Sequence, residues 1–559
     1  MPAAHPQQQG RLVSFVLPVS LGIALALAMT WPLALYLGSE IPVEWGDPLF
    51  DTWHVAWVGH ALLEQPLDLF QANRFWPERD SLAFNDIMLG YGPLGMIGAQ
   101  SPGAALVVHN LLVLFAYVLA FVGAYLLARE LGARWPGAVV AGAAFAYAPW
   151  RLAHVRHLNV ISSGGIPLTL FLLIRGYRRG SGRTVLAGWL VATWQMTLGF
   201  SLGLQFGYLL LLLGVIAGIW WLHSGAPRPT RAVLRATVIG VILLGLTVAL
   251  LARPYLRVVD EHTEATRSKD IIAFFSPSTS GFLAAPPENL IWGDATADTR
   301  DSFTEPIEQV LFPGVAITLL ALLGLGSAAY PAGLRIGLGA GVVVTSVLSM
   351  GLPHPDGDAG YTPCRFLYDF APGWDGIRTP TRINTLTSLG LALLAGAGVS
   401  VITKWLREGR YRPVLATAAL TATILFEGFG PIAHYGVPVK PVGQARAGAP
   451  QLHLPSGYGH DIIYTYWTIP DFPAIVNGSA SFELDRLLML RLQVAGFPDT
   501  SSVAVLRRLG VRTVILHPDL AVGTPWQGAS AKSVAGLPLR LEDRGDVVLY
   551  HLDPLSRTD

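Results

Sequence analysis

The sequence predicts a mainly helical, polytopic membrane protein that ends in a small α/β domain. The chain of 559 residues is 52% hydrophobic and only 13% charged, whereas a soluble domain usually carries about 25% charged residues. Several apolar runs are free of charge, such as "LLVLFAYVLAFVGAYLLA" at residues 111–128. About 20 helical residues cross the hydrocarbon of a bilayer, so such runs indicate membrane helices. A more polar, strand-rich stretch after about residue 435 indicates the second domain.

Charge and cysteine content exclude several other classes. The net charge of +1 predicts no nucleic-acid partner. The single cysteine, Cys364, excludes an internal disulfide and a cysteine-based zinc site. A cleaved signal peptide is an alternative for the N-terminal apolar run. That run is too long for a typical signal core and has no clear cleavage site, so we expect the first transmembrane helix there.

Apolar run length predicts about eleven transmembrane helices, which together form a membrane domain over residues 1–434. They are expected at residues 12–37, 104–128, 137–150, 159–174, 185–199, 203–222, 234–253, 310–330, 335–352, 383–403 and 413–431. Arginine and lysine cluster in the loops around residues 175–183, 228–235 and 404–412, which places these loops and the N-terminus in the cytoplasm. The acidic loops 37–100, 254–308 and 353–382 then lie outside.

Residues 435–559 are predicted to form an extracytoplasmic α/β domain. "SVAVLRRLGVRTVILHP" combines a helical pattern, a glycine stop and a strand, and "QLHLP" and "DVVLYHL" also indicate strands. The domain shows no catalytic signature, which favours a scaffold or a lid over the membrane domain.

The first outer loop opens with "GDPLFDTWHVAW". Asp47 and Asp51 are four residues apart, so they share one face if the stretch is helical. His54 lies close by. Trp53 and Trp57 are expected at the membrane interface as amphipathic anchors. The alternative to a functional site is a set of solvated loop acids beside interfacial aromatic rings.

Further polar residues on the predicted outer side lie later in the first loop and at the outer end of the third span. Asp86 lies later in the first loop, in "FNDIM", and Arg151, His154 and His157 lie in "APWRLAHVRHLNV". Polar residues at membrane depth are costly and usually face a cavity. Two histidines three residues apart are weak evidence for a metal, so we expect a phosphate or sugar contact. Snorkelling at the interface is the alternative.

The stretch "FAPGWDGIRTPTRIN" carries Arg378 and Arg382 just before a span, on the predicted outer side. This position opposes the usual cytoplasmic bias of basic residues. Because a guanidinium offers a rigid fork suited to phosphate, we expect a phosphate clamp. Contact with anionic lipid headgroups is the alternative. The outer loop 254–308 is also long enough to have a function of its own.

Acids, histidines and arginines on one membrane face suit the transfer of a sugar from a lipid phosphate. The leaving phosphate needs cations to hold developing charge, and the acceptor hydroxyl needs one carboxylate base. A glycoside hydrolase would instead favour two paired carboxylates.

The order of these motifs resembles the GT-C superfamily of multispanning glycosyltransferases, and more closely a bacterial set distantly similar to YfhO-type proteins. The resemblance runs from "GDPLFDTWHVAW" through "FAYAPWRLAHVRHLNVISS" and "APGWDGIRTPTR" to "LRRLGVRTVILH", and so covers nearly the whole chain. It implies that Asp47 is the first-loop acid, that Asp86 is a second acid of that loop, and that Arg151 begins an "R-x-x-H-x-x-H" stretch. Ile87 departs from the pattern, which has histidine there, and puts a proton relay in doubt.

The resemblance implies a glycosyltransferase of the bacterial inner membrane that uses a polyprenyl-phosphate sugar donor and a glycan or lipid-linked acceptor. We expect Asp47 as general base and Asp86 as a second catalytic carboxylate, either a second base or an acceptor-binding group. We expect no cofactor; a divalent cation is an alternative that the sequence does not indicate. Substrate contacts are expected from Asp51, His54, Arg151, His154, His157, Arg378 and Arg382. A lipid or polysaccharide transporter, or flippase, is one alternative, although its expected internal repeats are not seen. A non-catalytic envelope assembly protein is the other.

Overall fold

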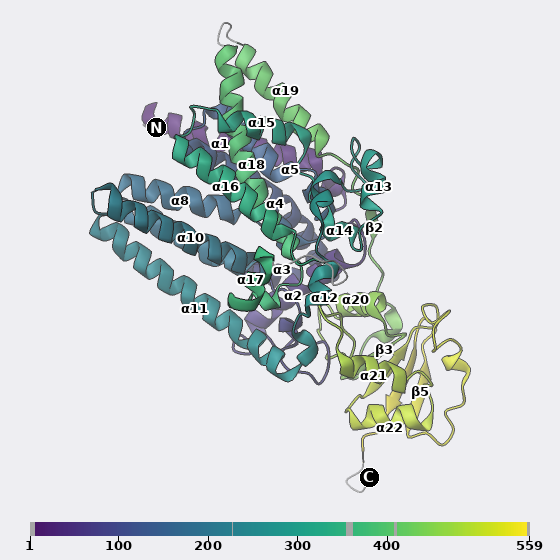
Figure 1. Cartoon of the computed structure of the whole chain (residues 1–559). Coiled ribbons are helices and arrows are strands. Elements are labelled where there is room, and N and C mark those ends of the chain that lie inside the picture. The colour runs from purple at the N-terminus through teal and green to yellow at the C-terminus, as the bar shows by residue number, and fades with distance from the viewer. Residues whose placement is uncertain (1–5, 226, 354–361, 407–410, 556–559) are drawn as a thin grey trace, which may run out of the picture. The chain divides into compact units, whose positions relative to one another are not determined.

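The computed structural model describes residues 6–225, 227–353, 362–406 and 411–555, and the chain divides into two compact units (Figure 1). We call the first the helical unit; it comprises Met1–Leu35, Asn110–Leu251 and Thr266–Ala433. We call the second the mixed unit; it comprises Tyr36–His109, Ala252–Ala265 and His434–Asp559.

The helical unit contains a helix at each predicted apolar segment. Two long helices, α4 (Pro102–Leu131) and α11 (Arg231–Glu261), pass from one unit into the other along the chain. The remaining helices are α1 (Pro6–Met29), α5 (Trp135–Tyr147), α6 (Trp150–Ala153), α7 (Leu158–Ile161), α8 (Gly165–Arg179), α9 (Gly182–Met196), α10 (Phe200–Ser224), α12 (Lys269–Phe274), α13 (Ala297–Arg300), α14 (Pro306–Gln309), α15 (Val315–Leu325), α16 (Ala332–Ser349), α17 (Pro363–Phe370), α18 (Asn384–Trp405) and α19 (Arg412–Glu427). Within the described residues, six helical segments are long and apolar enough to cross a membrane. The count of eleven spans therefore stays a prediction.

Glycine allows the central helices to approach closely. A Cβ atom on Gly324 of α15 would lie 1.9 Å from the carbonyl oxygen of Leu394 on α18, and one on Gly398 would lie 2.1 Å from that of Leu320. Small residues of this kind are the usual interface between membrane helices, because packing rather than the hydrophobic effect holds such helices together. Helix α18 packs on α5, α15 and α16 and forms the centre of the unit.

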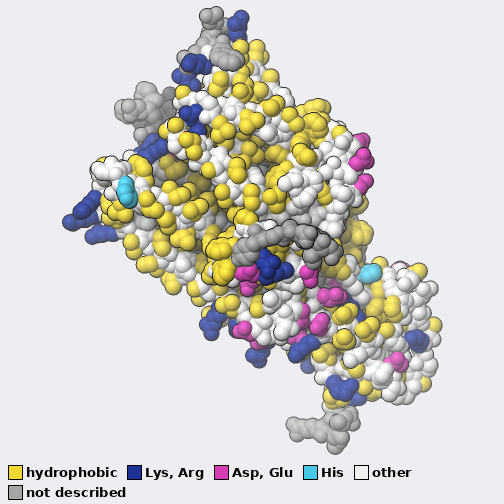
Figure 2. Space-filling view, viewed as in Figure 1, with side chains coloured by type: hydrophobic (Ala, Val, Ile, Leu, Met, Phe, Trp, Pro, Cys, Tyr) yellow, Lys and Arg dark blue, Asp and Glu magenta, His cyan; other side chains and the backbone are white. Residues whose placement is uncertain are grey.

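The outer helices present apolar side chains to their surroundings. Only 28% of the most apolar window of α10 is buried, and only 17% of that of α11. Figure 2 shows hydrophobic side chains over most of the visible face of the helical unit. A soluble protein rarely exposes apolar surface on this scale, whereas a lipid bilayer favours it. The chain is therefore an integral membrane protein.

The mixed unit is built around a four-stranded sheet in the order β3-β4-β6-β5. Strand β3 (Gln451–Leu454) runs parallel to β4 (Thr513–Leu516), and β6 (Val548–Leu552) pairs antiparallel with both β4 and β5 (Leu539–Asp543). The predicted strands "QLHLP" and "DVVLYHL" contain β3 and β6. The other elements are α2 (Asp47–Glu64), α3 (Gly92–Gly98), α20 (Tyr458–Trp467), α21 (Asp485–Gln493), α22 (Thr500–Arg508) and the pair β1 (Glu40–Pro42) and β2 (His434–Gly436).

The core of the mixed unit joins distant parts of the chain. Leu452 and Val514 from the sheet share one buried cluster with Phe75 and Phe84 from the first predicted outer loop and Val258 from the end of α11. Residues 435–559 therefore bury their apolar surface partly against other segments of this unit. That they act as a domain of their own stays a prediction.

Candidate functional site

In the helical unit, a break in helical structure positions the two predicted histidines. Helix α5 ends at Tyr147, and the short helices α6 and α7 follow. The backbone N–H of Trp150 donates to the carbonyl of Phe312 at 3.1 Å, and its indole N–H donates to Ser388 Oγ at 2.5 Å. These contacts hold α6 in place, and His154, the residue that follows α6, is positioned with it.

Both histidines face one carboxylate, Glu308 on α14. The His154 Nε2 atom is 3.4 Å from Glu308 Oε2, and the His157 Nε2 atom is 4.0 Å from Glu308 Oε1. Arg382, which precedes α18, pairs with the same carboxylate at 2.7 Å from Nη2 to Oε1. Two separate segments of the helical unit thus converge on Glu308, which was not among the residues predicted from the sequence.

The cluster of His154, His157 and Glu308 has the composition of a cation site. Its ligand atoms all lie within 4.8 Å of one another, and all three residues are buried. His154 Nδ1 lies 3.2 Å from the carbonyl oxygen of Trp150. A carbonyl only accepts, so this contact orients the Nε2 lone pair of a neutral ring toward Glu308. A lone pair facing a carboxylate requires a proton or a cation between them, and two imidazoles with one carboxylate suit zinc.

Charges within the cluster keep Glu308 ionised. Burial raises the pKa of Glu308, but the charge of the Arg382 guanidinium outweighs it and holds that pKa well below its usual range. Burial lowers the pKa of His154, against the opposite effect of the Glu308 carboxylate. Burial and the nearby charge of Glu308 raise the pKa of Glu305. The carboxylate beneath Arg382 is therefore a permanent anion near neutral pH.

The predicted arginines differ in their surroundings. Arg378 lies with its guanidinium 4.7 Å from the centre of the Phe275 ring. Arg151 is almost wholly buried, and its two terminal nitrogens donate to Ser163 Oγ at 3.0 Å and to the carbonyl of Ile161 at 2.9 Å. These bonds bridge the segment that carries α7. Arg151 therefore has a structural role there, and its predicted substrate contact stays a prediction.

In the mixed unit, "GDPLFDTWHVAW" forms the start of α2, with Asp47 in its first turn. Asp47 is half-buried, Asp51 is buried, and His54 is wholly buried. The backbone N–H of Met88 donates to His54 Nε2 at 3.3 Å. Burial, assisted by the charge of Arg74, lowers the pKa of His54 to about 3. His54 is thus a neutral acceptor that fastens α2 to the segment after Asp86.

The prediction that Trp53 and Trp57 are interfacial anchors is wrong. Their side chains are 0% and 3% exposed, because they stack on each other within the mixed unit. Arg74, which the sequence analysis missed, lies 5.0 Å from the centre of the Trp53 ring and donates to Asn85 Oδ1 at 2.8 Å. Burial lowers the pKa of Arg74 to about 9. The Asp86 loop and α2 therefore share a buried cation.

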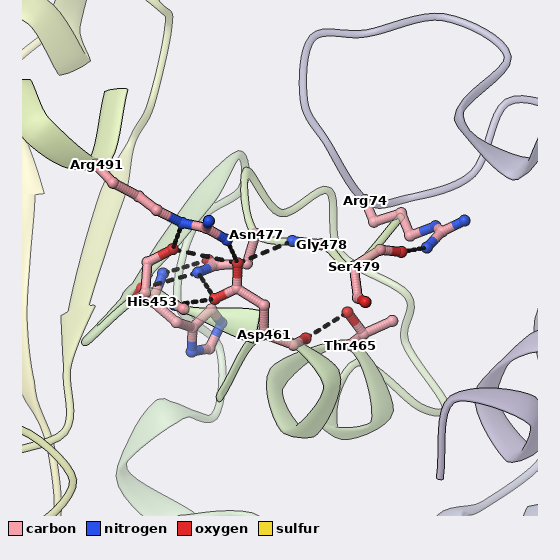
Figure 3. Close-up of polar contacts among 10 residues, drawn as sticks. Arg74, His453, Asp461, Thr465, Asn477, Gly478, Ser479 and Arg491 are labelled. Atoms are coloured by element: carbon pink, nitrogen blue, oxygen red, sulfur yellow. Dashed lines mark hydrogen bonds and ion pairs between the residues drawn. The ribbon is translucent and has the colours of Figure 1, made fainter. Parts of the chain in front are cut away.

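A second buried carboxylate, Asp461 on α20, is saturated with donors (Figure 3). Arg491 Nη2 donates to it at 2.9 Å, Asn477 Nδ2 at 2.8 Å and the backbone N–H of Gly478 at 3.3 Å. Ser456 Oγ also donates at 3.2 Å. Through these bonds Asp461 holds the end of β3, α20 and α21 together.

The structure thus places the predicted residues in two groups. His154, His157 and Arg382 meet at Glu308 in the helical unit, and Asp47, Asp51 and His54 share α2 in the mixed unit. Asp86 is half-buried in the same unit as α2. Its neighbouring segment is pinned by the Tyr255 hydroxyl, which donates to the carbonyl of Asn85 at 3.0 Å.

No protein-family model and no curated protein matches the sequence. Among solved structures, the chain is similar to the arabinofuranosyltransferase AftD from Mycobacteria, with a TM-score of 0.59 and 15% identity over 98% of this chain and 42% of AftD. It thus spans less than half the length of AftD. An oligosaccharyltransferase from Archaeoglobus fulgidus matches with a TM-score of 0.46 and 11% identity over 97% of this chain and 75% of that chain. The similarity to AftD shows that this chain shares the fold of a solved arabinofuranosyltransferase, in agreement with the fold class that the sequence resemblance implied.

Proposed function

We propose that the chain is a membrane glycosyltransferase that moves a sugar from a polyprenyl-phosphate donor to an extracytoplasmic acceptor of the cell envelope. The observation that carries this proposal is the buried cluster at Glu308, set in a GT-C fold. It places a guanidinium and two imidazoles close to the ends of membrane helices, where the phosphate of a lipid-linked donor would bind.

The cluster supplies what a leaving phosphate requires. A guanidinium has five N–H donors in a fixed fork suited to phosphate, and Arg382 points Nε and Nη2 at Glu308. Arg382 and Arg378 are the proposed cations for the donor phosphate. A divalent cation held by His154, His157 and Glu308 would add positive charge for the same purpose. Fixed positive groups of this kind stabilise charge as it develops in the transition state.

Asp47 is the proposed general base. The acceptor oxygen attacks the anomeric carbon, the bond from that carbon to the phosphate oxygen breaks, and polyprenyl phosphate leaves with the electron pair. The hydroxyl proton passes to the Asp47 carboxylate. Asp47 is half-buried in the first turn of α2, where the partial positive charge of a helix N-terminus favours a carboxylate. Asp86 is proposed to bind the acceptor or to serve as a second base, and Asp51 and His54 to support the same segment.

The direct test is transfer by the purified full chain in lipid nanodiscs. Arabinofuranose is the sugar to test first, because AftD is an arabinofuranosyltransferase. Radiolabelled polyprenyl-phosphate arabinofuranose should yield polyprenyl phosphate only when a glycan acceptor is present. A transporter or flippase would instead move the intact donor between leaflets of a sealed vesicle. Movement without cleavage would overturn the proposal and favour that alternative.

A further inference from the structure

The mixed unit contains a cavity of about 290 Å³ beside β3 and α20. We call it the β3–α20 cavity; it is lined mainly by Lys440, residues 444–447, His453, Tyr464, Trp467 and Asp471. Its size approaches the range of about 300–1,000 Å³ for small-molecule sites. At roughly 30 Å³ per water it holds on the order of ten waters, which is comparable to the heavy atoms of one sugar ring with its hydroxyl groups.

A rigid aromatic cluster forms one wall of this cavity. The rings of His453 and Tyr464 stack with centroids 4.8 Å apart, and Trp467 lies 5.6 Å from Tyr464. The Trp467 indole N–H donates to the carbonyl of Pro438 at 2.9 Å. His517 lies behind and completes the stack, at 4.9 Å from Tyr464. His453, Tyr464 and Trp467 therefore line the cavity with rings that their neighbours hold in place.

Two buried polar atoms at the cavity have no hydrogen-bond partner among the described residues. They are the Tyr464 hydroxyl and Gln444 Oε1. Tyr464 is wholly buried and Gln444 is 7% exposed. Buried polar groups are nearly always paired, because an unmade hydrogen bond costs free energy. The Tyr464 hydroxyl can donate or accept a hydrogen bond, whereas Gln444 Oε1 only accepts. A ligand with hydroxyl groups can pair with both.

Backbone strain borders the same cavity. Arg446 and Phe472 adopt φ angles of 62° and 46°, in the left-handed region that residues other than glycine rarely enter. Arg446 lines the cavity, and Phe472 lies between the lining residues Asp471 and Pro473. Such conformations persist where the surrounding structure enforces them, and they cluster at binding sites.

The charges of the lining identify the class of ligand. Lys440 and Arg446 are cationic, whereas Asp471 is anionic. A purely anionic ligand would meet Asp471 and Gln444 Oε1, and a purely cationic ligand would meet Lys440 and Arg446. Sugar hydroxyls both donate and accept, so they can satisfy all of these groups, while the C–H face of the ring packs on the aromatic wall. We infer that the β3–α20 cavity binds one neutral sugar residue of the glycan acceptor. That this sugar belongs to the acceptor rests on the proposed transferase function.

Binding of neutral methyl glycosides tests this inference without turnover. The full chain in lipid nanodiscs, free of glycoside detergents, is titrated with the methyl glycosides of arabinofuranose, galactose, mannose and glucose, and with methyl glucuronide as an anionic probe. Saturation-transfer NMR detects contact and gives Kd values. We expect at least one neutral glycoside to bind. Asp471→Asn and Arg446→Gln should each weaken its Kd at least tenfold, whereas Arg540→Gln, on the opposite edge strand β5, should leave it unchanged.

The inference is overturned if no neutral glycoside binds the folded wild-type chain, if only the glucuronide binds, or if the two cavity variants bind like wild type. Failure of the proposed function is a separate result. If the wild-type chain binds the glycoside but transfers no sugar, the sugar-binding inference holds and the proposed transferase function is refuted. In an active chain, the cavity variants should raise the acceptor KM and leave the donor Kd unchanged.

Discussion

The ion pair of Arg382 and Glu308 allows the structural and the substrate-binding roles of Arg382 to be separated. Their atoms lie 2.7 Å apart, and the side chains are 11% and 5% exposed. Removing one partner of such a buried pair leaves an uncompensated charge and costs about 3–5 kcal/mol, whereas replacing both is often close to neutral. Arg382→Gln and Glu308→Gln should therefore each destabilise the chain, and the double variant should recover most of the loss.

Donor affinity should follow a different pattern. A charge-assisted hydrogen bond contributes about 1.5–3 kcal/mol, which corresponds to roughly ten- to hundredfold in Kd. If Arg382 binds the donor phosphate, Arg382→Gln should weaken donor binding by that factor, and the double variant should be equally weak despite its recovered stability. Glu308→Gln alone should retain tighter binding than either.

Thermal unfolding followed by intrinsic fluorescence, and calorimetric titration with a polyprenyl-phosphate sugar, measure the two quantities in nanodiscs. Wild-type donor affinity in the double variant would refute the clamp and leave Arg382 as a partner of Glu308 only. Unchanged stability in both single variants would refute the ion pair itself.

Three further predictions test other parts of the molecule. After chelator treatment and reloading with Zn²⁺, the wild-type chain should retain about one equivalent by elemental analysis, and His154→Ala or His157→Ala should lose it; equal retention by the variants would exclude this cluster as the site. Burial lowers the pKa of His517 from 6.5 to about 3. Between these two pH values the unfolded chain binds a proton at this histidine and the folded chain does not. The free energy of unfolding should therefore fall as pH drops from about 6.5 toward 3, by up to about 1.4 kcal/mol per pH unit. The dependence of Tm on pH should be shallower in His517→Phe, and an unchanged slope would contradict this. Cysteines introduced at positions 178 and 500 of a chain lacking Cys364 should label from opposite sides of the membrane, and labelling from one side would refute the predicted topology.

Local features of the fold could be predicted from the sequence because they depend on composition and periodicity. Uncharged apolar runs locate the helices at each predicted segment, and the stretches "QLHLP" and "DVVLYHL" locate β3 and β6. The close packing of α15 on α18 could not be predicted, since it depends on Gly324 and Gly398 facing specific backbone carbonyls. The long apolar runs that mark these helices do not reveal which faces meet.

The candidate site could be predicted only in part, because long-range pairs leave no local signature. His154 and Arg382 were selected from their loops, but Glu308, their common partner, is more than 70 residues from either. Its one sequence signal is a carboxylate just before the apolar run "VLFPGVAITLL", at the same predicted boundary. The prediction that Trp53 lies at the membrane interface is wrong for the same reason. Trp53 is buried against Arg74, and this contact depends on tertiary structure.

Sugar transfer by Asp47→Asn tests the central proposal most directly. The substitution preserves the shape of the side chain and its place in the first turn of α2, and removes the proton acceptor. The transfer rate from a polyprenyl-phosphate sugar should fall by about 10²-fold or more, the usual contribution of a general base, while the donor Kd stays near wild type. Asp51→Asn should have a much smaller effect. Wild-type turnover in Asp47→Asn, with turnover abolished in Asp86→Asn, would contradict the assignment of Asp47 and move the base to Asp86.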